Sequence, residues 1–231
     1  MKLAVIGAMK KEIDFLLKHL ENHEVEKKLN HLFYCGSIAG KEMVVVESGI
    51  GKVASGILFS ALINSYPDLD LVINIGVAGG VKDKVEIGDI VVAEQLAYAD
   101  VDVRPGGDYY YGQIPNCPLY FSSRADIIKR IQISHPYKTG TILSGDSFFV
   151  DIEDVSTLIN THFPNQNVLA LDMESAAFGQ SAWFYGIPFI AIRAISDVIG
   201  YEAQFQSYLD NLELAATNSN LFLLEVIKKI G

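Results

Sequence analysis

Cysteine is scarce in this sequence, where Cys35 and Cys117 are the only two among 231 residues. Two cysteines build no disulfide framework, and no Cys/His cluster has the spacing of metal ligands, so disulfide-stapled and zinc-binding classes are excluded. Basic residues are also few, with 18 Lys and Arg against 28 Asp and Glu and a formal net charge of −10. An acidic surface repels phosphate backbones and anionic lipids. We therefore expect a small-molecule ligand, and neither nucleic acid nor membrane as a partner.

Long apolar runs are missing too. No apolar stretch reaches the roughly 18 residues that suggest a membrane span. The apolar start of the chain is cut short by Lys10, Lys11 and Glu12, with no small-residue cleavage site behind them. We expect a cytoplasmic protein without a secretory signal. Linkers, low-complexity segments and internal repeats are absent as well, and the length suits a single domain over residues 1–231.

What the sequence does have is a regular alternation of short apolar runs with segments of helical period. The apolar runs predict strands at 3–6, 31–39, 43–47, 71–75, 88–98, 138–144, 168–171 and 188–196. The helical segments lie at 9–20, 52–63, 125–133, 155–162, 173–185 and 207–229. This alternation is typical of an α/β protein with a mainly parallel sheet covered on both faces. Ligands of such proteins bind beyond the carboxyl ends of the strands.

Acidic residues follow two of these strands. Glu12 falls in the first turn of a predicted helix, where a carboxylate is favourable in itself, so its position alone indicates a helix-terminus charge. Asp172 and Glu174 join a strand directly to a helix. A helix cap explains Asp172 better than it explains Glu174.

Arg193 lies inside an apolar strand that leads to Asp197. Burying a lone guanidinium costs free energy, so we expect Arg193 to meet a carboxylate, with Glu12 and Glu174 as the candidates. The two-residue period of a strand puts Arg193 and Asp197 on one side if the strand continues that far. A purely structural ion pair is the alternative, and we favour a functional role.

Two glycine-rich turns and a pair of aromatics lie at the same edge. The turns at 49–52 and 76–80 allow a ligand to approach the backbone closely, although neither is a Walker A loop and ordinary strand-to-helix turns are an equal alternative. Phe148 and Phe149 follow another strand. Two rings at the mouth of a sheet suit stacking on a planar base, whereas adjacent phenylalanines more often pack in a core or lid.

Together these segments resemble the 5′-methylthioadenosine/S-adenosylhomocysteine nucleosidases, which belong to the nucleoside phosphorylase superfamily. The resemblance covers nearly the whole chain. It runs through IGAMKKE at 6–12, SGIGKV at 48–53, NIGVAGG at 74–80, GQIP at 112–115, SGDSFF at 144–149, LDMESA at 171–176 and IRAISD at 192–197. It implies a three-layer α/β/α sandwich around a mixed, mainly parallel twisted sheet.

The resemblance also implies an activity, the hydrolysis of the N-glycosidic bond of 5′-methylthioadenosine and S-adenosylhomocysteine. The products are adenine and a 5-thioribose compound, as in methionine salvage. The family's general acid matches Asp197, which protonates or hydrogen-bonds purine N7, and its acid/base for the attacking water matches Glu12. Glu174 matches the carboxylate that holds the ribose hydroxyls, Arg193 orients these carboxylates, and Ser196 supports the loop of Asp197. No metal or organic cofactor is implied.

The remaining site residues implied by the resemblance surround the nucleoside. Phe148 flanks the adenine, the backbone at Phe149 reads its N1 and N6 edge, and Phe205 packs beside the ribose. Met9, Ile50, Val77, Ala78, Gly79, Leu171 and Met173 complete the substrate-binding set. A neighbouring subunit of a homodimer closes the 5′ pocket, with Val103 and Pro115 as the matching contributors.

The sequence departs from the family at four places. Asp172 stands where Glu is usual, which matters little if it is a cap, and Val77 stands where some members have Ser. The segment 102–112 is one residue longer and lacks the usual Phe, and the segment 197–205 is two residues shorter. The last two changes lie on segments that shape the 5′ pocket, so they bear on the 5′ substituent more than on the reaction.

Three alternative functions follow from the same residues. A nucleoside phosphorylase needs a cationic phosphate site, but Asn74 stands where bacterial hexameric phosphorylases place an Arg, and Glu12 repels phosphate, so hydrolysis is favoured. A 6-amino-6-deoxyfutalosine hydrolase has the same base site, but its substrate carries a larger, acidic 5′ group. The altered segment 102–112 keeps this alternative open, although no extra cation is evident near it. A non-catalytic adenosine-binding module is disfavoured because Glu12, Glu174 and Asp197 are all present.

Overall fold

Ten strands form one mixed sheet in the computed structural model, which describes residues 1–230. The strands are β1 (Lys2–Gly7), β2 (Glu21–Lys28), β3 (His31–Ile38), β4 (Lys41–Glu47), β5 (Leu71–Gly80), β6 (Ile90–Tyr98), β7 (Phe121–Ser122), β8 (Lys138–Ser144), β9 (Val168–Asp172) and β10 (Phe189–Val198). The helices are α1 (Lys10–Leu17), α2 (Lys52–Ser65), α3 (Ala125–Lys129), α4 (Ile152–His162), α5 (Ser175–Tyr185) and α6 (Gln204–Lys229), with a 3₁₀ turn η1 (Arg104–Gly106). The predicted α/β fold is confirmed.

Strand β5 is the junction of the sheet. The order is β10-β6-β8-β9-β5-β1-β4-β3-β2, with β7 beside β6, and β5 also pairs with β10. The strands β5, β9, β8, β6 and β10 therefore pair in a closed ring, while β1, β4, β3 and β2 extend from it. Parallel pairing of β5 with β10 and antiparallel pairing with β9 bring the ends of these strands together around Gly79 and Gly80.

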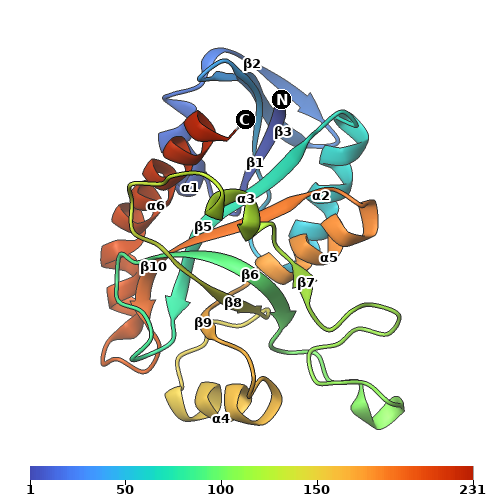
Figure 1. Cartoon of the computed structure of the whole chain (residues 1–231), viewed down its shortest axis with the longest axis vertical. Coiled ribbons are helices and arrows are strands. Elements are labelled where there is room, and N and C mark those ends of the chain that lie inside the picture. Colours follow the sequence, from blue (N-terminus) through green and yellow to red (C-terminus); the bar gives the residue numbers. More distant parts are fainter. Residues whose placement is uncertain (231) are drawn as a thin grey trace.

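Helices cover both faces of the sheet. In Figure 1, α1 and α6 lie on one side of it, and α2 and α5 lie on the other. Strand β1 contributes side chains to the cores on both faces of the sheet, because successive side chains point to opposite faces. Leu3 and Val5 pack in the cluster that includes residues of α1 and α6, whereas Ala4 and Ile6 pack in the cluster that includes residues of α2 and α5.

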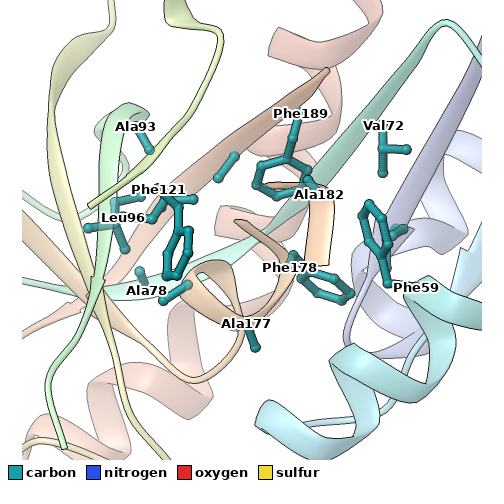
Figure 2. Close-up of a cluster of buried hydrophobic side chains, with 14 of the residues drawn as sticks. Phe59, Val72, Ala78, Ala93, Leu96, Phe121, Ala177, Phe178, Ala182 and Phe189 are labelled. Carbon is teal, nitrogen blue, oxygen red and sulfur yellow. The ribbon is translucent and has the colours of Figure 1, made fainter. Parts of the chain in front are cut away.

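Aromatic side chains fill the layer between the sheet and the second pair of helices. Figure 2 shows Phe59 of α2, Phe178 of α5 and Phe189 of β10 in one cluster. The ring centroids of Phe59 and Phe178 are 6.3 Å apart, and those of Phe178 and Phe189 are 6.4 Å apart. This packing anchors α5, whose amino end carries part of the pocket described below.

Several element bounds differ from the prediction. Strand β5 runs on to Gly80 instead of ending at residue 75, because β10 and β9 pair with its glycine-rich end. Helix α1 stops at Leu17, and α6 begins at Gln204, three residues earlier than predicted. Strand β2 was not predicted, since its exposed polar residues lie at the sheet edge and pair only with β3. Within residues 1–230, no helix combines the length and the apolar character of a membrane span.

Candidate active site

A cavity of about 270 Å³ opens at the carboxyl ends of the strands. Most of the predicted site residues line it, namely Met9, Glu12, Ile50, Val77, Ala78, Gly79, Phe148, Phe149, Leu171, Met173, Glu174, Ser196, Asp197 and Phe205. The structure adds Ala8, Ser147, Asp172, Ile199 and Tyr208 to this wall. Arg193, Val103 and Pro115 do not line it.

Glu12 is buried at the start of α1, where one carboxylate oxygen accepts hydrogen bonds from the residues just before the helix and the other accepts one from β5. Its Oε2 accepts the backbone N–H groups of Ala8 at 2.6 Å and Met9 at 2.9 Å, and its Oε1 accepts that of Val77 at 3.1 Å. Burial raises the pKa of Glu12, although the Arg193 charge and these N–H donors oppose the rise. The residue therefore caps a helix, as its position suggested, and also faces the cavity.

Gly76 makes room for this carboxylate. A Cβ atom at position 76 would lie 2.6 Å from Oε1 of Glu12, closer than real contacts allow. The glycine-rich end of β5 thus has a specific purpose, since any larger residue at Gly76 displaces Glu12.

Asp197 is 1% exposed near the end of β10. The Ser196 hydroxyl donates to its Oδ1 at 2.7 Å, and the Gln204 side-chain amide donates to its Oδ2 at 2.7 Å. Burial raises the pKa of Asp197, and these two hydrogen bonds oppose the rise. Gln204 was not predicted as a site residue, because an isolated polar residue at the start of an amphipathic helix carries no sequence signal.

Glu174 is the third buried carboxyl in the cavity. It lies at the amino end of α5, and its Oε1 accepts the backbone N–H of Gly51 at 2.9 Å. Burial, with Asp172 nearby, raises the pKa of Glu174 to about 7, against the lowering effect of Arg193. The glycine-rich turn at 49–52 thus holds a carboxylate through its backbone.

The partner predicted for Arg193 was wrong. Its Nη2 forms an ion pair with Oδ2 of Asp172 at 2.9 Å and not with Glu12 or Glu174, and it also donates to Oδ1 of Asn74 at 2.5 Å. Asp172 also accepts the backbone N–H of Ser175 at 3.2 Å. The same carboxylate therefore caps α5 and neutralises the guanidinium of Arg193. Arg193 lies behind the cavity wall, because its buried charge is paired with Asp172 at the end of β9.

The strand that carries Arg193 does continue to Asp197, but a bulge interrupts it. The register of β10 against β5 shifts between Ile195 and Asp197. A two-residue period does not carry across a bulge. Arg193 and Asp197 are therefore not placed on one side of the strand by its two-residue period.

An aromatic cluster forms the outer wall of the cavity. The ring centroid of Phe148 lies 5.7 Å from that of Phe205 and 5.5 Å from that of Tyr208. Tyr208 projects from the second turn of α6 and points its hydroxyl at the sulfur of Met9, 3.9 Å away. The period of α6 was the available signal for Tyr208, since Phe205 and Tyr208 are three residues apart on a helix.

Val103 and Pro115 lie on the long connection between β6 and β7, outside the cavity of their own chain. Pro115 is exposed and Val103 is half-buried. Their contact with a neighbouring subunit stays a prediction.

The chemistry available in the cavity is that of carboxyl groups. Glu12, Glu174 and Asp197 line it with raised pKa values, and within residues 1–230 no lysine, arginine or histidine lines it. Titratable groups with shifted pKa values in one apolar cleft are typical of acid/base sites. Such a site suits proton transfer to and from an uncharged ligand and disfavours an anion.

The chain is similar to one class of known proteins over nearly its whole length. The family model of the phosphorylase superfamily matches residues 2–228. A 5′-methylthioadenosine/S-adenosylhomocysteine nucleosidase of Listeria welshimeri serovar 6b is 38% identical over 240 residues, covering 100% of each chain. The chain therefore belongs to the 5′-methylthioadenosine/S-adenosylhomocysteine nucleosidase family of that superfamily.

Solved structures agree with this membership. The nucleosidase of Streptococcus pneumoniae with the transition-state inhibitor MT-ImmA has a TM-score of 0.91 and 35% identity, covering 100% of both chains. The nucleosidase of Colwellia psychrerythraea 34H in complex with adenine has a TM-score of 0.89 and 35% identity, covering 99% of this chain and 96% of that one. A futalosine hydrolase mutant of Helicobacter pylori strain 26695 is less similar in sequence, at 29% identity with a TM-score of 0.87 over 98% of each chain.

Proposed function

We propose that this protein hydrolyses the N-glycosidic bond of 5′-methylthioadenosine and S-adenosylhomocysteine and releases adenine. The observation that carries the proposal is one cavity lined by the carboxyl groups of Glu12, Glu174 and Asp197, on whose wall no basic residue lies within residues 1–230. Family membership supports the substrate class, and the relatives above carry this activity in their names.

Cleavage of an N-glycosidic bond develops positive charge on the ribose and negative charge on the base, as in the oxocarbenium-like states of glycoside hydrolysis. Asp197 protonates N7 of the adenine, which makes the base a better leaving group. Burial favours this role because an acid must keep its proton near neutral pH. Each such proton transfer contributes roughly 10²–10⁴-fold to the rate.

Glu12 activates the attacking water, and Glu174 holds the ribose hydroxyls. Glu12 is held by three backbone N–H groups from two elements, so its carboxylate is oriented before any ligand arrives. Glu174 is held by Gly51 in the same manner. Arg193 supports this arrangement indirectly, through Asp172 and its charge near both glutamates.

At the base, Phe148 flanks the adenine ring and the backbone of Phe149 reads its N1 and N6 edge. Phe148 is 41% exposed, so an apolar face is available to a planar ligand. Phe205, Met9 and Ile50 surround the ribose and the 5′ substituent from the outer wall of the cavity. This wall is apolar, which suits a thioether.

Phosphate dependence separates hydrolysis from phosphorolysis. A phosphorylase needs cations to bind phosphate. Here the carboxylate of Glu12 lines the cavity, and the side chain of Asn74 accepts a hydrogen bond from Arg193. We expect adenine release from 5′-methylthioadenosine at the same rate with and without phosphate. Release that required phosphate would overturn the hydrolase proposal in favour of a phosphorylase.

We also propose a homodimer, with residues 1–231 acting as a single domain in each subunit. Large apolar side chains are exposed on the paired helices α2 and α5, among them Val53 at 73% and Phe184 at 77%. Ile50 is 55% exposed and also lines the cavity, so the apolar face and the pocket mouth are continuous. A second copy on this face closes the 5′ pocket with its Val103 and Pro115.

A further inference from the structure

The side chain of Gln204 joins three parts of the site. Its Nε2 donates to Oδ2 of Asp197 at 2.7 Å and to the backbone carbonyl of Phe149 at 2.9 Å. Its Oε1 accepts the backbone N–H of Gly200 at 3.0 Å. One amide thus connects β10, the aromatic segment after β8 and the turn before α6.

The partners themselves determine which way this amide faces. The carbonyl of Phe149 and the carboxylate of Asp197 require a donor, and the N–H of Gly200 requires an acceptor, so a flipped amide loses all three bonds. Gln204 is 5% exposed. A buried amide whose bonds are all made is a rigid connection, because every rotation leaves a polar group unpaired.

The backbone before Gln204 is built to deliver it. Gly200 and Ala203 have left-handed φ angles of 84° and 55°, which reverse the chain between β10 and α6. A Cβ atom at Gly200 would lie 2.5 Å from Cβ of Ile152, so this turn is closely packed. Gln204 does not line the cavity and contacts Asp197 and Phe149 from behind its wall.

We propose that Gln204 is a positioning residue that holds the acid Asp197 and the base-reading carbonyl of Phe149 at a fixed separation. Recognition of the 6-amino edge of adenine and protonation of N7 are thereby coupled in one rigid unit. The inference rests on the proposed function, in which Asp197 is the acid and Phe149 reads the base.

Gln204 also acts on the acidity of Asp197. Both carboxylate oxygens accept a hydrogen bond, from Ser196 and from Gln204, and each bond favours the charged form over the acid. The other titratable groups that line the cavity are Glu12 of α1, Asp172 at the end of β9, Glu174 before α5 and Tyr208 of α6. Burial and the charges of Glu12, Asp197 and Glu174 raise the pKa of Tyr208. None of these groups brings a positive charge.

The sign of the effect follows from the role of the acid. Asp197 acts only when protonated, so activity falls as pH rises through its pKa. Removing the Gln204 donor favours the protonated form. The alkaline limb of the pH profile should therefore move to higher pH while the maximal rate falls, because the acid is less well placed.

The test compares Gln204→Met with Gln206→Met in the full-length protein. Gln206 lies two residues along the same helix and is exposed, and within residues 1–230 its side chain bonds only to Asp210, at 2.8 Å, so it controls for the substitution itself. We expect Gln204→Met to lower kcat on 5′-methylthioadenosine by about 10²-fold, the typical cost of a small misplacement. KM should change little, and the alkaline limb should move to higher pH.

A second readout is base selectivity. The ratio of rates on 5′-methylthioadenosine and its 6-oxo counterpart, 5′-methylthioinosine, should fall in Gln204→Met and stay unchanged in Gln206→Met. Gln204→Glu keeps the acceptor for Gly200 but replaces both donors with a second carboxyl beside Asp197. It should move the alkaline limb in the same direction, which keeps the test available if Gln204→Met folds poorly.

A Gln204→Met enzyme that lost thermal stability but kept the kcat, the pH profile and the base selectivity of the wild type would overturn the inference, since Gln204 would then be structural only. Failure of the underlying function looks different. A wild-type protein that released no adenine, or an Asp197→Asn variant at wild-type rate, would overturn the proposed function itself, whatever Gln204→Met does.

Discussion

Arg193 and Asp172 form a buried ion pair behind the cavity, with 2.9 Å between Nη2 and Oδ2 and 2% of each side chain exposed. Asn74 accepts a further hydrogen bond from the same Nη2. The positive charge of Arg193 therefore reaches the cavity only as an electrostatic influence on Glu12 and Glu174, and no guanidinium N–H is presented to a ligand.

Asp172→Asn should destabilise the protein strongly. The change leaves the guanidinium of Arg193 buried without a compensating charge, which costs about 3–5 kcal/mol in comparable cases. Urea unfolding measures it. Asp68→Asn is the control, because Asp68 pairs with Lys2 at the surface and its loss should change little. Equal stability of the two variants would contradict the importance given to the buried pair.

Glu174→Gln should remove part of the pH dependence of stability. The pKa of Glu174 is about 7 in the folded protein and ordinarily 4.5, so the unfolded chain releases this proton at lower pH than the folded protein does. Stability therefore falls as pH rises from about 4.5 to about 7, by about 3 kcal/mol for a group of this kind. The unfolding free energy of Glu174→Gln, measured across that window, should fall less steeply than that of the wild type. Parallel curves would show that Glu174 titrates normally.

Gly76→Ala should impair catalysis more than folding. The new Cβ atom would lie 2.6 Å from Oε1 of Glu12, so the carboxylate must move away from the water site. We expect kcat to fall by about 10²-fold. Gly56→Ala is the control, because a Cβ atom there meets nothing within 4 Å and alanine favours the helix α2. Full activity of Gly76→Ala would show that the position of Glu12 is not critical.

Phe184→Asp should separate the subunits of the proposed dimer. Phe184 is the most exposed large apolar side chain of α5, and a carboxylate at an apolar interface is costly. Sedimentation velocity should show a monomer, and adenine release should fall because the 5′ pocket lies open. Leu214→Asp, on the opposite face at 59% exposure, should leave dimer and activity intact. A wild-type monomer with full activity would contradict the proposal.

Much of the fold could be predicted because its signals are local. Apolar runs and helical periods located eight of the strands and all the described helices of more than one turn, and the resemblance to the family indicated fourteen of the residues that line the cavity. Strand β2 could not be predicted, because only Val25 among its residues is apolar and the strand is ordered by pairing with β3 alone.

The wrong and the missed predictions at the site concern choices among neighbours in space. Three carboxylates, of Glu12, Asp172 and Glu174, lie at the same edge of the sheet as possible partners of Arg193. Only the register of β9 and β10 with β5 favours Asp172. Gln204 became part of the site because the turn from Gly200 to Ala203 faces it toward Asp197. Neither pairing has a periodicity or a motif that a single sequence displays.

The most direct measurement for the central claim is the rate of adenine release from 5′-methylthioadenosine by the wild type and by Asp197→Asn under the same conditions. Asparagine keeps the shape of the buried side chain but cannot donate the proton. We expect adenine release by the wild type and a loss of roughly 10²–10⁴-fold in the variant. Release at the wild-type rate by Asp197→Asn would contradict the assignment of the acid and the mechanism built on it.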